Sequence, residues 1–174
     1  MYAQDSEFVA QIVFDTRPRL KGLSSARFVG NAVMTRCLAS PMNSLTGGIN
    51  AQSLAQVALS VRQLVNGVDP QYIGHVLDML HDDPSCFMCP VSYSLTKTAM
   101  FLSNQSRFEL YTADFGSGTP VWVSPIRKFV NNFFSILPAP PGTGGYIIYT
   151  SMMTQTTAKL MQNKFWMNVA DLVY

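Results

Sequence analysis

The sequence predicts an α/β fold in which helices form a second layer against a mixed β-sheet. The chain has 174 residues, about one domain's worth. Two adjoining segments in the middle repeat their apolar residues at helical spacing, and segments rich in β-branched and aromatic residues lie on either side. The order strand, two helices, several strands and helix is typical of a two-layer domain. We therefore expect a single domain over residues 1–174.

The first expected strand covers residues 8–14, which are mostly apolar and β-branched or aromatic. It ends at residues 15–19, where Pro18 disfavours helix for the residue before it. A second strand is expected over residues 32–37, before Pro41 interrupts the chain.

The clearest helix is predicted over residues 49–66, with Gly67 at the position where glycine commonly ends a helix. A second helix is expected to begin after Asp69 as its N-cap, with Pro70 in the first turn, and to stop before Asp83. The apolar residues that carry the helical spacing are Leu54, Val57, Ala58, Val61, Leu64, Val65, Ile73, Val76, Leu77 and Leu80.

Beyond these helices the pattern returns to strands. Strands are expected at residues 98–102, 133–137 and 146–150. The turn-rich residues 138–145 are interpreted as a hairpin loop rather than a domain linker. Residues 121–123 are expected to be short and extended, with Trp122 in the core. Thr154 is expected to cap a last helix that runs to the end of the chain.

The composition excludes several classes of function. The net charge is +2 and no basic run interleaves with aromatic residues, so nucleic acid binding has little support. No apolar run approaches the roughly 20 residues of a membrane helix, and the first residues do not resemble a signal peptide. We therefore expect neither nucleic acid nor membrane as partners and a cytoplasmic location.

The cysteines and histidines do not form a metal site by spacing. Cys86 and Cys89 have the spacing of zinc ligands, but no second pair follows. His75 and His81 do not stand at ligand spacing with them. Ordinary thiols are the preferred interpretation, and a redox pair is the alternative.

Residues 114–118 form the most informative local pattern. Gly116 and Gly118 permit positive φ, Phe115 can insert into the core below the turn, and Asp114 can accept hydrogen bonds or pair with an arginine. Protein kinases also carry Asp-Phe-Gly, but this chain has neither their glycine-rich phosphate loop nor their His-Arg-Asp segment.

In context, the loop belongs to a series of motifs. Residues 15–19 read Asp-Thr-Arg-Pro-Arg, residues 28–33 contain Phe-Val-Gly-Asn, and Ser103 and Asn104 precede the loop at 114–118. This series resembles the carboxy-terminal half of BAHD acyltransferases, particularly their fungal relatives, over nearly the whole chain. Departures at Val29, Ser117 and Asn104 indicate a divergent member.

The resemblance implies a half domain similar to chloramphenicol acetyltransferase, which forms one wall of a channel between two like domains. Acyl-CoA would enter from one side as co-substrate, with no bound cofactor, and a small-molecule acceptor from the other. The partner would be an amino-terminal half domain on the same or a separate chain. The low charge fraction of 13% and the ten methionines fit an apolar face covered by that partner.

The general base of the family, the histidine of His-x-x-x-Asp, is missing from this chain. His75 precedes Asp78 by three residues rather than four, and His81 has Ser85 at the fourth position. We therefore assign no catalytic residue and no metal ligand, and we do not expect the chain to be active alone.

The remaining residue assignments follow from the loop and the resemblance. We expect Asp114 to pair with Arg17, or with Arg19 as second choice; the alternative is that Asp114 caps its own turn. Ser103, Asn104 and Thr150 are the weaker candidates for the substrate channel.

Two functions stay open at this point. In the first, the chain is part of an O- or N-acyltransferase of secondary metabolism that acts on a small natural product. The chain begins inside an expected core strand, which favours truncation over a split enzyme. The second is a non-catalytic binding or interaction domain derived from the same fold.

Overall fold

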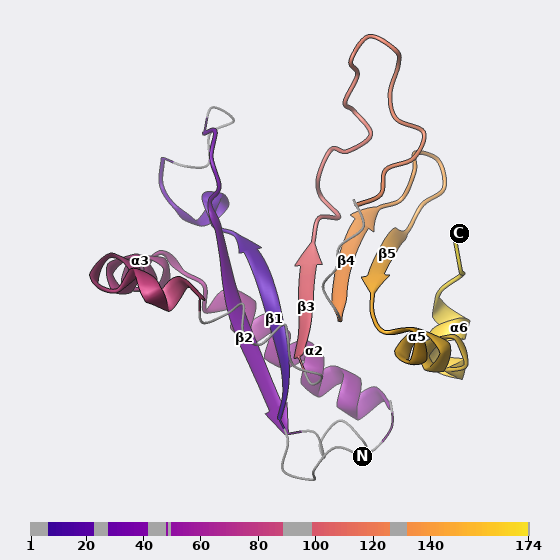
Figure 1. Cartoon of the computed structure of the whole chain (residues 1–174), viewed down its shortest axis with the longest axis horizontal. Coiled ribbons are helices and arrows are strands. Elements are labelled where there is room, and N and C mark those ends of the chain that lie inside the picture. The colour runs from indigo at the N-terminus through magenta and orange to yellow at the C-terminus, as the bar shows by residue number, and fades with distance from the viewer. Residues whose placement is uncertain are drawn as a thin grey trace.

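The computed structural model describes residues 7–22, 28–41, 48, 50–88, 99–125 and 132–173. Within these residues, five strands form one mixed sheet in the order β2-β1-β3-β4-β5 (Figure 1). Their bounds are β1 Glu7–Asp15, β2 Val33–Pro41, β3 Ala99–Asn104, β4 Phe133–Pro138 and β5 Tyr146–Ser151. The outer pairs, β1 with β2 and β4 with β5, are antiparallel, whereas β1, β3 and β4 run parallel. The α/β fold with a mixed sheet is therefore confirmed.

Helices α2 (Ala51–Asn66) and α3 (Pro70–Asp82) have the local signals that the sequence predicts. Asn50 and Ser53 form a capping box at the start of α2, in which each side chain accepts the backbone N–H of the other residue. Asp69 caps α3 by accepting the N–H of Tyr72 at 2.7 Å. A 3-10 turn, η1 (Arg17–Arg19), follows β1, and another, η2 (Pro84–Met88), follows α3.

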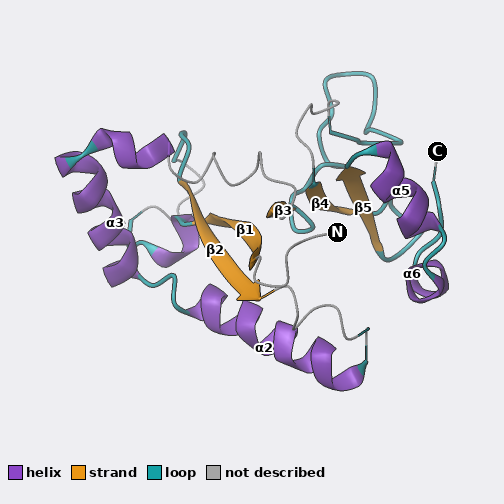
Figure 2. Cartoon of the chain, turned by 60° about the horizontal axis from the view of Figure 1, so that its bottom comes forward, coloured by secondary structure: helices purple, strands orange, loops and turns teal. Residues whose placement is uncertain are grey.

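The main core lies between one face of the sheet and these two helices. Figure 2 shows α2 running across the sheet on this side. The buried members of the core are Ile12, Phe14, Leu64, Val68 and Ile73. Burial of one such side chain contributes about 1.5–3 kcal/mol, so this cluster fixes the helices on β1 and β2.

Two arginines satisfy carbonyl groups at the carboxyl end of α2, which has no basic residue in its own last turn. Arg19 donates to the carbonyl oxygen of Val65 at 2.7 Å, and Arg36 donates to that of Leu64 at 3.3 Å. Gly67 has a φ of −76°, so it is not left-handed; a Cβ there would lie 2.6 Å from Arg36 Nη1. A side chain at this position would therefore require the Arg36 guanidinium to move.

The end of the chain departs from the expectation of a single helix. Two short helices form instead, α5 (Thr154–Met161) and α6 (Lys164–Val169), because the side chain of Asn163 caps α6 by accepting the N–H of Trp166 at 3.1 Å. The expected cap at Thr154 is also wrong: Met153 is the N-cap residue and has no side-chain capping bond. Neither helix has a buried residue. The predicted hairpin between β4 and β5 is confirmed, since Pro138 pairs with Tyr146.

Candidate functional site

The loop at residues 114–118 is organised by Asp114 itself. Asp114 Oδ1 accepts the backbone N–H groups of Gly116 at 2.8 Å and Gly118 at 3.0 Å. Both glycines have positive φ, of 96° and 93°, which a side chain would strain. The carboxylate therefore caps its own turn, and the expected pairing of Asp114 with Arg17 is wrong.

The two arginines proposed as partners of Asp114 are bound elsewhere. Arg17 forms an ion pair with Asp15 at 3.2 Å, donates to the carbonyl oxygen of Gly30 and lies over the ring of Phe28. Arg19 is held at the end of α2. Asp15 is only two residues from Arg17, so the carboxylate is available to the guanidinium within the same turn.

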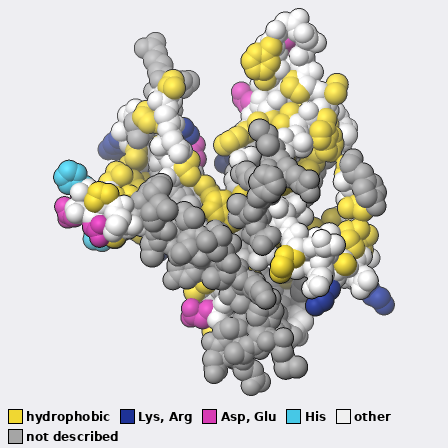
Figure 3. All heavy atoms as spheres, viewed as in Figure 1, with side chains coloured by type: hydrophobic (Ala, Val, Ile, Leu, Met, Phe, Trp, Pro, Cys, Tyr) yellow, Lys and Arg dark blue, Asp and Glu magenta, His cyan; other side chains and the backbone are white. Residues whose placement is uncertain are grey.

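Residues 105–125, which we call the arm, extend beyond the ends of β3 and β4 (Figure 1). Several large apolar side chains of the arm are exposed: Phe115 by 96%, Val121 by 89% and Trp122 by 47%. The expectations of Phe115 and Trp122 in the core are therefore wrong. The expected extended segment at 121–123 forms no strand. In Figure 3, hydrophobic side chains are prominent on this part of the surface.

The sheet face opposite α2 carries a buried polar row. Leu102 packs toward the helices, so the next residue on β3, Ser103, faces the other way. Ser135 pairs with Ser103 across β3 and β4 and therefore shares its face, as does Gln11 on β1. Ser103 is 9%, Ser135 1% and Gln11 3% exposed. Within the described part of the chain, neither Ser135 Oγ nor Gln11 Oε1 has a hydrogen-bond partner.

The three channel candidates do not lie together. Ser103 is in the buried row, whereas Asn104, the next residue, is exposed at the end of β3, where its Oδ1 accepts the N–H of Ser106 at 3.0 Å. Thr150 pairs with Phe134, which pairs with Leu102, so Thr150 lies on the helix-side face. The register of the sheet thus places Ser103 and Thr150 on opposite faces.

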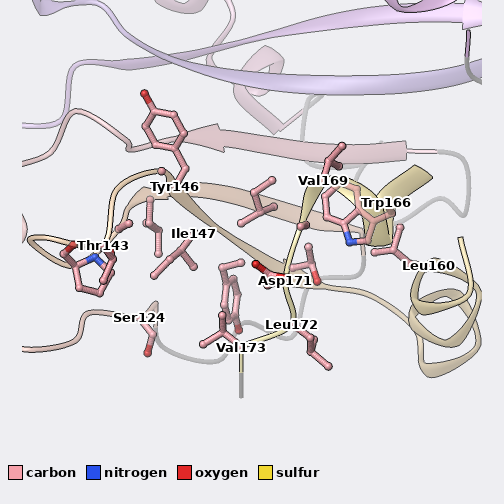
Figure 4. A pocket seen from close by; sticks show the side chains of 18 of the residues that line it. Ser124, Thr143, Tyr146, Ile147, Leu160, Trp166, Val169, Asp171, Leu172 and Val173 are labelled. Atoms are coloured by element: carbon pink, nitrogen blue, oxygen red, sulfur yellow. Dashed lines mark hydrogen bonds between the residues drawn. The ribbon is translucent and has the colours of Figure 1, made fainter. Parts of the chain in front are cut away.

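A cavity of about 890 Å³ lies between β5, the loop before it and the last two helices. It is lined by residues that include Trp122, Leu137, Tyr149, Leu160, Trp166 and Asp171. Figure 4 shows Leu160, Trp166 and Asp171 around it, together with residues of β5 and the carboxy-terminal segment. Sequence reasoning missed this site; the apolar residues of the last helix gave a signal for a packed face but not for a space beside it.

No cluster of three or more histidine, cysteine or acidic side chains that would suit a metal ion occurs among the described residues. His75 and His81 are exposed on α3, and Cys89 lies outside the described residues. Hydrogen bonds from Ser85 and Cys86 lower the pKa of Asp83 below its ordinary value. None of the helices described in the structure is long and apolar enough to cross a membrane.

Comparison with known proteins gives consistent matches. Residues 3–166 match the model of the Transferase family. Shikimate O-hydroxycinnamoyltransferase of Nicotiana tabacum is 24% identical over 162 residues, which are 88% of this chain and 34% of that protein. The crystal structure of vinorine synthase superposes with a TM-score of 0.68 at 16% identity, covering 98% of this chain and 37% of that one.

A fungal structure matches equally well. TRI101 of F. graminearum, crystallised with coenzyme A and T-2 mycotoxin, superposes with a TM-score of 0.70 at 19% identity, covering 96% of this chain and 37% of that one. The chain thus spans about a third of the length of the curated relatives that it matches.

Proposed function

Since this chain belongs to the Transferase family, the family of BAHD acyltransferases, we propose that it forms one wall of the substrate channel of an acyl-CoA-dependent acyltransferase. The acceptor is the hydroxyl or amine of a small natural product. The other wall is an amino-terminal half, on the same or a separate chain. The chain then corresponds to a single carboxy-terminal domain over residues 1–174.

The observation that carries the proposal is a match along nearly the whole chain to one part of much longer acyltransferases. The family model matches residues 3–166, yet the chain spans only 34% of the tobacco hydroxycinnamoyltransferase. A structural neighbour that contains coenzyme A shares the fold over 96% of this chain. Acyl-CoA as co-substrate follows from these relatives.

The transfer reaction explains why this chain needs another half. A general base takes the proton from the acceptor, whose oxygen or nitrogen then attacks the thioester carbonyl, and the coenzyme A thiolate leaves. No His-x-x-x-Asp segment occurs in the 174 residues. We therefore propose that the other half supplies the base and that this chain orients the substrates.

Among the three channel candidates, Asn104 has the side chain that is open to a substrate. It lies at the end of β3, where the arm begins, and it is exposed. Ser103 is buried in this chain. Its hydroxyl therefore reaches a substrate only if the sheet face opposite α2 becomes uncovered. Thr150 lines the cavity beside β5 instead.

An acyl-transfer assay tests this proposal. The chain is supplied with acetyl-CoA or a hydroxycinnamoyl-CoA and a panel of alcohols and amines, and release of the coenzyme A thiol is followed. It is assayed alone and together with an amino-terminal half that contains His-x-x-x-Asp, such as one encoded upstream in the same genome. We expect thiol release only from the combination. Activity of the chain alone would contradict the role given to the other half, and no activity from the combination would contradict the transferase function.

One observation favours a second candidate function. A binding domain derived from the fold requires a ligand site but no base, and this chain has a large cavity and lacks the family's base. Ligand binding without any thiol release in the combined assay would favour this second function.

A further inference from the structure

The cavity beside β5 has the size of a small-molecule site and opens to solvent. Its volume of about 890 Å³ falls within the usual range for ligand sites, roughly 300–1,000 Å³. One side is β5 and the loop that precedes it, and the other is α5, α6 and residues 170–173. Residues 122, 124 and 125 of the arm complete the lining. Three separate parts of the chain therefore converge on one space.

The lining is aromatic on several sides. Trp122 comes from the arm, Tyr149 from β5 and Trp166 from α6. Aliphatic side chains such as Leu137 and Leu160 also line the cavity. Aromatic and aliphatic surfaces favour a ligand with an apolar, planar body, and the faces of tryptophan and tyrosine also attract cations.

The charge of the lining residues favours some of these ligands over others. Of the described residues that line the cavity, only Asp171 carries a full charge at neutral pH, and no lysine or arginine is among them. Asp171 forms no ion pair with any described residue. Figure 4 shows it in the middle of the lining, between Leu172 and the β5 side. A carboxylate among aromatic rings attracts a cation and repels the phosphates and carboxylates of anionic ligands.

We propose that this cavity binds an arylalkylamine, in which an alkyl chain joins an aromatic ring to a protonated amino group. The ring packs between Trp122, Tyr149 and Trp166, and the ammonium group pairs with Asp171. The carboxylate of Asp171 favours an ammonium group over the phosphate groups of acyl-CoA. The inference therefore goes beyond the proposed transfer function and is tested without it.

The chain contains its own reporters for this site. It has two tryptophans, and both line the cavity. Bound ligand changes the surroundings of each indole, so intrinsic fluorescence follows occupancy directly. The variants Trp122→Phe and Trp166→Phe each leave a single reporter, and we expect the remaining indole to respond in both.

The experiment is a titration with three probes that share a phenyl ring and a butyl chain: phenylbutylamine, phenylbutanol and phenylbutyrate. We expect the amine to bind about tenfold more tightly than the acid, with the alcohol between them, because only the charge differs. Asp171→Asn should weaken binding of the amine about threefold, as for a partly exposed ion pair. The same substitution should leave binding of the alcohol unchanged.

The matched control is Asp78→Asn, which removes an exposed carboxylate on α3, outside the cavity. It should change none of the three affinities. Far-UV circular dichroism and thermal unfolding verify that each variant is folded. Equal affinity for all three probes would overturn the proposal, because the lining would then be an apolar surface that does not select by charge. Absence of any fluorescence change in the folded chain would overturn it as well.

Discussion

The amino-terminal region, residues 7–82, and the carboxy-terminal region, residues 99–173, use the same sheet in different ways. All five buried members of the main core belong to the first region, where α2 and α3 cover β1 and β2. In the second region, α5 and α6 have no buried residue, the arm exposes Phe115 and Val121, and a cavity of about 890 Å³ lies beside β5.

The two regions also differ in how far their apolar side chains are covered. Arg19 and Arg36 satisfy carbonyl groups at the end of α2, so this helix end is stabilised within the first region. Each region leaves a buried polar atom without a partner among the described residues, Gln11 Oε1 in the first and Ser135 Oγ in the second. In the second region, however, large apolar side chains of both the arm and α6 face solvent. Exposed apolar surface of this kind commonly marks interaction sites. The amino-terminal region is thus a folding core, whereas the carboxy-terminal region presents surfaces for binding.

The largest effect that sharpens this comparison is expected for Ile73→Ala. Ile73 is 1% exposed in the core between α3 and the sheet. Loss of its side chain should reduce the free energy of unfolding by about 3 kcal/mol, from lost burial and the cavity left behind. Met167→Ala on α6, where the side chain is 43% exposed, should cost less than about 0.5 kcal/mol. Urea unfolding measures both, and equal losses would contradict the difference between the regions.

A smaller loss, about 2 kcal/mol, is expected for Arg19→Ala, because hydrogen bonds to charged groups contribute more than neutral ones. The guanidinium donates to the carbonyl oxygens of Val65 at 2.7 Å and Val68 at 2.5 Å. Thermal unfolding provides the measurement, with Arg62→Ala on the exposed side of α2 as the control. A similar loss in both variants would show that removal of a positive charge near α2, rather than loss of the two hydrogen bonds, sets the effect.

Asp114→Ala should cost about 1 kcal/mol, since two backbone N–H groups lose their acceptor on an exposed loop. Asp114→Asn keeps an acceptor oxygen and should cost less. Arg17→Ala should leave the backbone amide signals of Gly116 and Gly118 unchanged in an NMR spectrum. Their displacement in Arg17→Ala would restore the pairing of Asp114 with Arg17 that the structure does not show.

The smallest effect concerns the end of α3. The pKa of Asp83 is lowered from 3.8, first by the hydroxyl and backbone N–H of Ser85 and then by Cys86. A carboxyl whose pKa is lowered in the folded state adds stability at pH values above its pKa in the unfolded chain. That stability is lost as the pH falls through the pKa of the folded state. Ser85→Ala should raise the pKa of Asp83 toward 3.8 in an NMR titration. An unchanged pKa would assign the shift to the backbone instead.

The sequence predicts this molecule best where the signals are local. Asp69 and Pro70 indicate the start of α3, and the turn-rich residues 138–145 indicate the hairpin. Asn163 is also a local capping signal, and attention to it would have divided the last helix into α5 and α6. These elements are determined by neighbouring residues, so a single sequence suffices to find them.

The site was harder to predict because it depends on contacts across the chain. Asp114 has both a short-range partner, its own turn, and long-range candidates, and the motif alone does not decide between them. The motifs predict Ser103 and Thr150 as channel residues, but the register across β3, β4 and β5 places them on opposite faces. The cavity joins the arm, β5 and α6, which no spacing in the sequence relates.

Hydrogen exchange measured by mass spectrometry on the chain alone tests the difference between the two regions most directly. We expect slow exchange for amides of β1, α2 and α3, and fast exchange for α5, α6 and the arm, because the latter have few buried contacts. Addition of an amino-terminal half that contains His-x-x-x-Asp should slow exchange in the arm and leave β1 unchanged. Equal protection of α3 and α6 in the chain alone, or no protection of the arm by a half that binds, would contradict the account.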